Sequence, residues 1–465
     1  MANARQPNII FIMSDDHAAH AISAYGSAIN ETPRIDRIAN EGARFDNCFC
    51  TNSICAPSRA TILSGVHSHL NGVLTLADPF DGRQETFPKR LRAAGYQTAI
   101  FGKWHLGHGG EADPTGFDRW AVLPGQGLYH DPDFFVMGER TPFQGYATDL
   151  ITDFSLDWLR ARDRDRPFLL MVHHKAPHRP WHPDEAHSRL YDDADIPLPE
   201  TFDDDYSNRS NAARNATMRI ERDLTPEDLK EPVPAGLSLR EVKLWKYQRY
   251  IKDYLRCIAS VDDNVGRVLD YLDDDGIADD TIVVYTSDQG FFLGDHGWYD
   301  KRFMYEESLR MPFLMRYPGE IPAGTVVDAL VSNLDFAPTF LDYAGMDPVH
   351  RMQGRSFRRI AAGTGPEADW PTAVYYRYWM HLSDHGVPAH YGIRTQTHKL
   401  IYYYGEALGT TNSIDQPTPP EWELFDLASD PQELRNVYDD PAHVETVAAL
   451  RDELYRLKAH YGDER

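Results

Sequence analysis

A cysteine and an arginine one helical turn apart belong to the stretch whose residue types are best suited to chemistry. Cys55 is followed by Ala56, Pro57, Ser58 and Arg59. Because Pro57 suits the first turn of a helix, Cys55 is expected at a helix N-terminus. Free amides and the dipole at such an end lower the pKa of a thiol and hold an oxyanion. The pattern predicts an activated cysteine supported by Arg59, and the alternative is a small buried cysteine before a helix.

Two pairs of oxygen-bearing side chains follow apolar runs of the chain. Asp15 and Asp16 come directly after the run 8–14, and Asp288 and Gln289 follow the run 281–286. Adjacent buried carboxylates repel each other unless a cation lies between them. A set made only of oxygen ligands favours Ca²⁺, with Mg²⁺ or Mn²⁺ as alternatives, over zinc. An ordinary solvated Asp-Asp turn is the other interpretation of Asp15 and Asp16.

Cationic side chains and histidines follow two further apolar runs. Lys103 and His105 come after 96–101, and His178 comes after 168–172. Each could be an ordinary surface or structural residue. In open α/β sheets, however, ligands bind beyond the carboxyl ends of the strands. We therefore expect these residues to share one site with the carboxylates.

The elements that position these residues indicate an α/β fold. The four apolar runs lack alternation, which is typical of strands buried on both faces of a mainly parallel sheet. Amphipathic stretches at 146–162 and 247–272 fit crossover helices that flank this large sheet. We predict an α/β domain over 1–365, which is expected to contain the catalytic residues.

The C-terminal part of the chain has a different character. A small, polar segment around 361–367 suggests a linker. Tyrosine-rich runs at 373–380, 391–395 and 399–404 read as short strands, and 441–460 reads as a helix. We predict a smaller C-terminal α+β domain over 366–465, built on an antiparallel sheet.

Composition excludes several classes of partner. The 465 residues include 47 basic and 71 acidic side chains, a formal charge of -24, which argues against binding to nucleic acid or to an anionic membrane. The four cysteines form no spaced metal motif and no obvious disulfide framework. The first apolar run is too short for a signal peptide or a membrane span, so we expect a cytoplasmic protein. The sequence does not predict the oligomeric state.

Motifs along most of the chain resemble those of one enzyme family. Cys-x-Pro-Ser-Arg at 55–59 resembles the maturation signature of type I, formylglycine-dependent sulfatases of the alkaline phosphatase superfamily. The segments Gly-Lys-Trp-His at 102–105, Lys-Ala-Pro-His at 175–178 and Asp-Gln-Gly at 288–290 are also similar to that family, in the same order. The region that begins at Lys301, continues through Tyr-Glu at 305–306 and ends with Arg-x-Pro at 310–312 is similar to the same family. The resemblance implies an alkaline-phosphatase-like fold and sulfate-ester hydrolysis.

The resemblance also implies roles for individual residues. A formylglycine-generating enzyme would oxidise Cys55 to an aldehyde, whose hydrate is the nucleophile in this family. The metal ligands implied by the resemblance are Asp15, Asp16, Asp288 and Gln289, and the cations around the sulfuryl group are Arg59, Lys103 and Lys301. His178 or Lys301 would be the general acid, and His105 would be the base. Gln289 departs from the Asn or His of many members, although its amide oxygen can still bind a hard cation.

The substrate is predicted less closely than the reaction. We expect a carbohydrate or small-molecule sulfate ester, such as a sulfated sugar or an aryl sulfate, contacted by the following residues: Trp181, His381, His385 and Arg394, with Trp379 as a further aromatic. The variants of the motifs look most like carbohydrate sulfatases, including those for 6-sulfated N-acetylglucosamine. The alternatives are a phosphonate monoester or phosphodiester hydrolase of the same superfamily, and a non-enzymatic protein that binds sulfated glycans with an unmodified Cys55.

Overall fold

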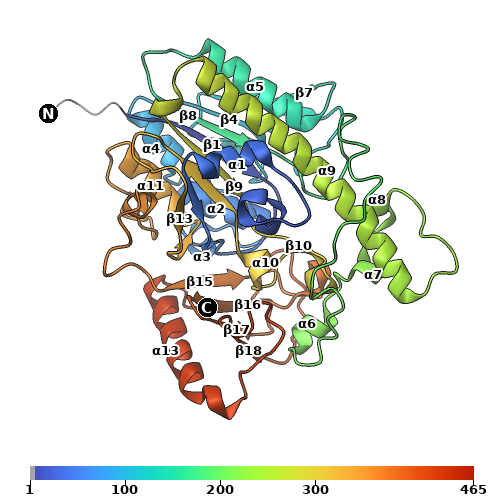
Figure 1. Ribbon diagram of the computed structural model, residues 1–465. Helices are drawn as coiled ribbons and strands as arrows, with labels where there is room; N and C mark the ends of the chain where they lie inside the picture. Colours follow the sequence, from blue (N-terminus) through green and yellow to red (C-terminus); the bar gives the residue numbers. More distant parts are fainter. Residues whose placement is uncertain (1–5) are drawn as a thin grey trace.

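A ten-stranded sheet forms the centre of the computed structural model, which describes residues 6–465 (Figure 1). Its order is β13-β2-β12-β9-β1-β8-β4-β5-β6-β7. The five central strands are parallel to one another: β9 (Thr281–Ser287), β1 (Asn8–Ser14), β8 (Phe168–His173), β4 (Gln97–Lys103) and β5 (Arg119–Leu123). The outer strands are β12 (Phe313–Arg316), β2 (Ala43–Phe45), β13 (Thr325–Val327), β6 (Asp133–Val136) and β7 (Glu139–Pro142). Antiparallel pairing of β12 with β9 and of β6 with β5 makes the sheet mixed, with a parallel centre.

Helices cover both faces of this sheet. On one side lie α1 (Pro33–Asn40), α5 (Ala147–Ala161) and α9 (Leu239–Asp274), and Figure 1 shows α5 and α9 side by side. On the other lie α2 (Cys55–Ser64), α4 (Phe87–Ala93) and α11 (Phe336–Tyr343), which contact one another. Phe11 of the central strand packs its ring against Phe336 and Phe340. Burial on both faces explains why the central strands are continuous apolar runs.

The long helix α9 begins well before the predicted start at Tyr247. The Ser238 hydroxyl accepts a hydrogen bond from the backbone N–H of Glu241, and the Glu241 carboxylate accepts one from the Ser238 N–H at 2.7 Å. This capping box satisfies backbone donors at the helix end. The first three residues of the helix are exposed and 242–245 are only half-buried, so the hydrophobic face that predicts the helix becomes clear only further along the chain.

The C-terminal sheet is antiparallel, as predicted. Its strands are β15 (Ala373–Tyr378), β16 (His390–Thr395), β17 (His398–Tyr403) and β18 (Glu421–Asp426), and α13 (Val444–His460) packs on it. In Figure 1 this sheet lies below the large one. One face, including Tyr375 and Leu424, packs with α13, whereas Tyr376 and Tyr378 join the core of the large domain. The predicted fold class is confirmed; the boundary between 365 and 366 stays a prediction.

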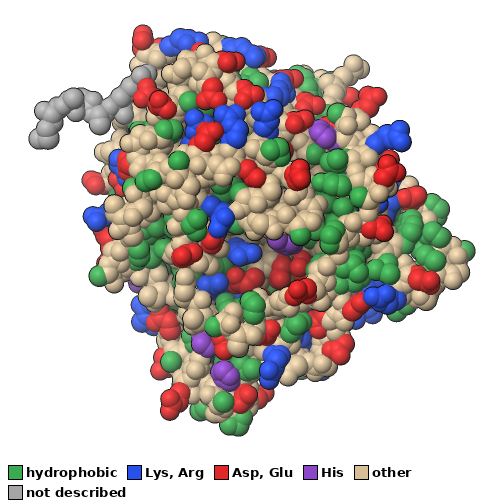
Figure 2. Space-filling model, viewed as in Figure 1, with side chains coloured by type: hydrophobic (Ala, Val, Ile, Leu, Met, Phe, Trp, Pro, Cys, Tyr) green, Lys and Arg blue, Asp and Glu red, His purple; other side chains and the backbone are tan. Residues whose placement is uncertain are grey.

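Charges of both signs are interspersed over the visible face of the molecule (Figure 2). Within residues 6–465, we find no helix that combines the length and the apolar character needed to cross a membrane. The expectation that the chain carries no signal peptide concerns its first residues, of which 1–5 lie outside the described residues. It stays a prediction. All four cysteines are free and buried.

Candidate active site

Cys55 is the first residue of α2, as the proline pattern predicts. Ile54 precedes it in an extended conformation, and Gly65 ends the helix with a left-handed φ of 64°. Every residue of α2 is buried, including Arg59. A polar helix start buried this deeply requires partners for its side chains, and charged groups from the strand ends provide them.

The environment of Cys55 contradicts the predicted lowering of its thiol pKa. Its Sγ lies 3.3 Å from Oδ1 of Asp15 and 3.7 Å from Nζ of Lys301. Burial, reinforced by the negative charge of Asp15, raises the thiol pKa well above its usual value. Desolvation therefore outweighs the helix N-terminus and the neighbouring lysines. A thiol whose pKa is raised is a poorer nucleophile than a thiolate.

Three carboxylates converge next to Cys55. Asp15, Asp16 and Asp288 each offer one oxygen within 4.8 Å of the others, and all three are buried. Asp16 has a left-handed φ of 68°, and its backbone N–H donates to Asp288 Oδ1 at 3.2 Å. Burial raises the pKa of Asp16 to about 7, with Lys301 opposing the effect and Asp15 adding to it. Such a concentration of buried negative charge fits a bound cation.

Gln289 completes the set of oxygen donors. Its side chain is buried, and its Oε1 has no hydrogen-bond partner among the described residues. Its Nε2 donates to the carboxylate of Asp16. An orphaned amide oxygen beside three carboxylates is the donor chemistry that hard divalent cations prefer. The residues present therefore fit the predicted metal site.

Each carboxylate is paired with one of the three predicted cations. Lys103 donates through Nζ to Asp15, and Lys301 Nζ lies 2.6 Å and 2.7 Å from the two oxygens of Asp16. The third pair joins Arg59 and Asp288, with Nε 2.9 Å from Oδ2. The structure thus brings together Arg59, Lys103 and Lys301 around Cys55.

The two predicted proton-transfer histidines also lie near this cluster. His178 donates from Nδ1 to the carbonyl of Arg179 at 2.6 Å, and its Nε2 lies 3.8 Å from Oδ2 of Asp16. His105 has a left-handed φ of 57°, and its buried Nδ1 has no hydrogen-bond partner among the described residues. Burial, followed by the charge of Lys103, lowers the pKa of both imidazoles well below the usual value.

A cavity of about 270 Å³ opens directly onto Cys55. It is lined by Cys55, Leu76, Gln126, His178, Arg179, Asp300, Lys301, Arg302, Asp384 and His385. Cys55, His178, Lys301 and His385 were predicted from the sequence. Arg179, Asp300 and Arg302 were missed, although each adjoins a predicted residue in the chain. Gln126 and Asp384 lie on loops outside the motifs. The prediction of His385 indicated the loop of Asp384, whereas no sequence signal indicated Gln126.

Asp300 fixes two of the groups that line this cavity. It has a left-handed φ of 80°, and its Oδ1 accepts a hydrogen bond from the backbone N–H of Lys301 at 2.9 Å. Its Oδ2 lies 3.3 Å from Nε2 of His385, whose Nδ1 donates to the carbonyl of Thr217. The loop that contains His385 is thereby joined to the segment that contains Lys301.

Three of the four predicted substrate contacts are corrected by the structure. Trp181 is fully buried against Tyr250 and Phe291, with no face open to a sugar ring. His381 is also buried, since its Nδ1 accepts from the Ala389 N–H and its Nε2 donates to the Gln416 carbonyl. The third, Arg394, is buried in ion pairs with Glu306. Trp379 is likewise enclosed, beneath the guanidinium of Arg377 at 3.6 Å.

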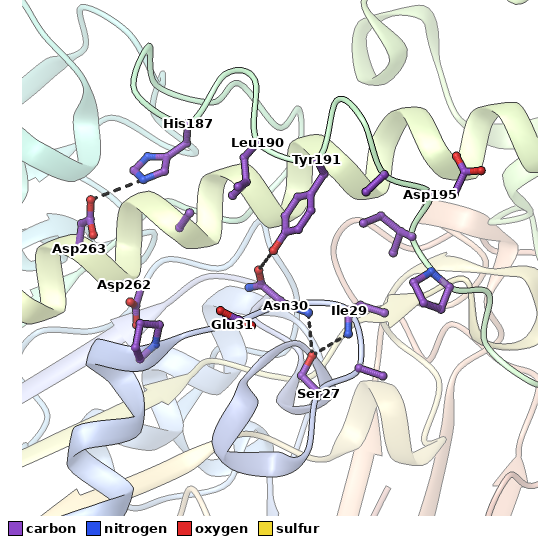
Figure 3. A pocket seen from close by; sticks show the side chains of 16 residues that line it. Ser27, Ile29, Asn30, Glu31, His187, Leu190, Tyr191, Asp195, Asp262 and Asp263 are labelled. Atoms are coloured by element: carbon purple, nitrogen blue, oxygen red, sulfur yellow. Dashed lines mark hydrogen bonds and ion pairs between the residues drawn. The ribbon is translucent and has the colours of Figure 1, made fainter.

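A larger cavity lies away from this chemistry. It has a volume of about 670 Å³ and is lined by the loop 27–33, the segment 187–197 and part of α9. Figure 3 shows Tyr191 and Asn30 meeting across it, where the Tyr191 hydroxyl donates to Asn30 Oδ1 at 2.7 Å. None of the residues predicted to be catalytic lines this cavity.

Comparisons with known proteins agree with this geometry. The family model described as Sulfatase matches residues 7–346, and the model described as N-sulphoglucosamine sulphohydrolase, C-terminal, matches residues 294–460. The chain belongs to the sulfatase family. It is a sulfuric ester hydrolase with the fold of the alkaline phosphatase superfamily.

Individual relatives refine the comparison. The chain is 43% identical to the N-acetylglucosamine-6-O-sulfatase of Bacteroides thetaiotaomicron, over 99% of this chain and 87% of that protein. A solved structure of a protein in complex with its substrate D-glucosamine-2-N,6-O-disulfate has a TM-score of 0.91, 43% identity and 99% coverage of both chains. The phosphonate monoester hydrolase of Agrobacterium radiobacter has a TM-score of 0.75 at 22% identity, covering 98% of this chain and 96% of that one, and shares the fold alone.

Proposed function

We propose that this sulfatase hydrolyses the 6-O-sulfate ester of a glucosamine or N-acetylglucosamine sugar. The observation that carries the proposal is the cavity that ends at Cys55, with the carboxylate cluster and three cations around it. The 43% identity to an N-acetylglucosamine-6-O-sulfatase, over nearly the whole chain, supports the choice of sugar.

We propose that Cys55 acts after conversion to formylglycine by a formylglycine-generating enzyme. The hydrated aldehyde supplies one hydroxyl for attack on sulfur and a second through which sulfate is later expelled. The high pKa of the unmodified thiol supports this proposal, since burial keeps the thiol from acting as a thiolate.

The residues around position 55 have distinct tasks in the proposed reaction. Arg59, Lys103 and Lys301 provide fixed positive charge for the sulfuryl oxygens, which carry the negative charge of the sulfate ester. Asp15, Asp16, Asp288 and Gln289 would hold a divalent cation, for which we favour Ca²⁺; this cation would add positive charge to the same group. His105 would accept a proton from the residue at position 55.

The leaving sugar oxygen must gain a proton as the sulfur–oxygen bond breaks. His178 and Lys301 both line the cavity, so either side chain can reach this oxygen. Since the Nδ1 proton of His178 is committed to the Arg179 carbonyl, His178 would act as the acid only as an imidazolium that donates through Nε2, a form that its lowered pKa disfavours in the free enzyme and that an anionic substrate would stabilise.

Substitution His178→Ala distinguishes these two candidates. If His178 is the acid, we expect kcat/KM for a sugar sulfate to fall roughly 1,000-fold, because an alkoxide leaves poorly without a proton. The loss for 4-nitrophenyl sulfate should be much smaller, since that phenolate leaves readily. Equal losses on both substrates, measured by steady-state kinetics, would exclude His178 as the acid and leave Lys301 as the remaining candidate.

Charged groups at the mouth of the cavity are suited to sugar hydroxyls. Among residues 6–465, the side-chain partner of Asp384 is Arg302, whose Nη2 donates to one carboxylate oxygen at 2.9 Å. The Asp384 side chain is 47% exposed, which leaves the other oxygen available as an acceptor. His385 lies beside it on the same wall of the cavity. The free carboxylate oxygen of Asp384 is an acceptor that fits a hydroxyl group, whereas both ring nitrogens of His385 are committed to Asp300 and to the Thr217 carbonyl.

We expect Asp384→Asn to weaken substrate binding more than it slows the chemical step. Loss of a charged acceptor should raise KM about tenfold with little change in kcat, because charged hydrogen bonds contribute roughly 1.5–3 kcal/mol. Sulfate release from N-acetylglucosamine-6-sulfate measures both constants. The exposed residue Asp328 provides the matched control Asp328→Asn. A fall in kcat alone would contradict a role in sugar recognition.

Comparing regioisomers and a matched phosphate ester tests the proposed function. We expect sulfate release from N-acetylglucosamine-6-sulfate, much less from the 3-sulfate, and a lower kcat/KM for N-acetylglucosamine-6-phosphate. Preference for the phosphate ester would favour a phosphoesterase, and turnover of the 3-sulfate alone would contradict the assignment to position 6.

A further inference from the structure

Gln126 contacts the buried cation Lys103 from a loop that carries none of the family motifs. The Nζ of Lys103 donates to two side chains, the carboxylate of Asp15 and the amide Oε1 of Gln126. Lys103 is completely buried, and Gln126 lines the cavity that ends at Cys55. One partner of this lysine is therefore charged and the other is neutral.

A tight turn after β5 directs Gln126 towards Lys103. In the parallel pair of β4 and β5, Lys103 lies opposite Leu123, so the chain leaves β5 beside this lysine. The Gly127 N–H donates to the carbonyl of Pro124 at 2.9 Å and closes the turn. Gly125 and Gly127 have left-handed φ values of 52° and 69°. These positive φ values favour glycine, and a Cβ at Gly127 would in addition press on the Leu123 side chain at 2.8 Å.

Three cations and three carboxylates meet around Cys55. The cations Arg59, Lys103 and Lys301 face the carboxylates Asp15, Asp16 and Asp288 in one-to-one pairs. A carboxylate in the place of Gln126 would therefore shift the balance towards negative charge, next to the position of an anionic group. A neutral amide satisfies Lys103 without cancelling its charge.

We propose that Gln126 is a positioning residue of this sulfatase, which holds Lys103 against the sulfate group while preserving the positive charge of the site. The amide acts through Lys103 and contributes no proton to the reaction. Its neutrality distinguishes this role from simple packing: a carboxylate of the same shape would hold the lysine equally well but would weaken the binding of an anion.

Two nearly isosteric variants separate charge from packing. Gln126→Glu keeps the acceptor and adds a negative charge, whereas Gln126→Met removes the acceptor and stays neutral. We expect kcat/KM for a sulfate ester to fall roughly 100-fold in Gln126→Glu and roughly tenfold in Gln126→Met. Gln97 begins the strand that ends at Lys103, and Gln97→Glu, at its partly exposed side chain, is the control expected to resemble the wild type.

Anion binding provides a readout that does not depend on turnover or on the identity of the sugar. Titration calorimetry of inorganic sulfate into the metal-loaded Cys55→Ala protein should give a Kd that rises about tenfold or more with Gln126→Glu. It should rise less with Gln126→Met. Equal losses in the two variants would reduce Gln126 to a packing role, and wild-type binding in both would overturn the proposal.

The proposal rests on the sulfatase activity but not on the proposed sugar. If the wild type fails on N-acetylglucosamine-6-sulfate yet cleaves an aryl sulfate, the proposed sugar is wrong, and the effect of Gln126→Glu is measured on the aryl ester.

If Gln126→Glu does not fold, as judged by its thermal transition, Gln126→Met becomes the deciding variant. This variant must then lower sulfate affinity and leave the binding of neutral N-acetylglucosamine unchanged. A wild-type sulfate affinity would contradict the proposal.

Discussion

Replacing Cys55 by alanine should reduce sulfate release to the background rate while leaving the fold intact. A methyl group cannot become an aldehyde, so the nucleophile is lost, and nucleophile replacements typically cost at least about 10⁴-fold in kcat. The thiol makes one contact with Asp15 and one with Lys301, both of which keep other partners. Steady-state kinetics on a sugar sulfate and a thermal unfolding curve measure the two halves of this expectation.

Cys50 is the matched control for this substitution. It belongs to the same segment and is equally buried, but its Sγ contacts the backbone carbonyl of Leu309 at 3.4 Å. We expect Cys50→Ala to retain most of the activity, with some loss of stability. Turnover that survives in Cys55→Ala, or is lost equally in both variants, would contradict the assignment of Cys55 as the precursor of the nucleophile.

Replacing Asp288 by asparagine should remove bound metal and activity together. Its Oδ2 accepts from Arg59 at 2.9 Å, while Oδ1 accepts from the Asp16 N–H, so the carboxylate joins the proposed metal site to the arginine proposed to bind the sulfate group. Loss of one charge from a set of oxygen ligands weakens the binding of a hard cation. We expect metal content by mass spectrometry to fall below one-tenth and kcat roughly 1,000-fold.

A second buried carboxylate serves as a control for Asp288. Asp262 accepts hydrogen bonds from the backbone N–H groups of Arg34 and Ile35, away from the catalytic cluster. Asp262→Asn should lower stability but leave metal content unchanged. If Asp288→Asn keeps its activity after the metal is lost, the metal has no part in the reaction.

The carboxyl ends of parallel strands made much of the active site predictable. Because β1, β4, β8 and β9 are apolar runs that end in ionisable residues, the convergence of Asp15, Lys103 and Asp288 follows from topology. No knowledge of the loops was needed for this step.

The sequence did not predict how deeply individual side chains of the site are buried. Trp181 is surrounded in the chain by proline, arginine and histidine, which suggests a surface loop, yet its ring packs under α9. The thiol of Cys55 was expected to be acidic because a helix end can be recognised locally, whereas desolvation depends on the whole fold. Gln126 was missed for a related reason: its contact with Lys103 depends on the pairing of β4 with β5 and on the turn after Leu123.

The most direct test of this account is the mass of the tryptic peptide 45–59, isolated from the protein made in its native host. Since this peptide also contains Cys48 and Cys50, fragmentation must locate the change at position 55. We expect an aldehyde in place of the thiol at position 55, shifted further in mass by an aldehyde-trapping reagent, and unchanged thiols at the other two positions. An intact thiol at position 55 in active protein would contradict the proposed nucleophile.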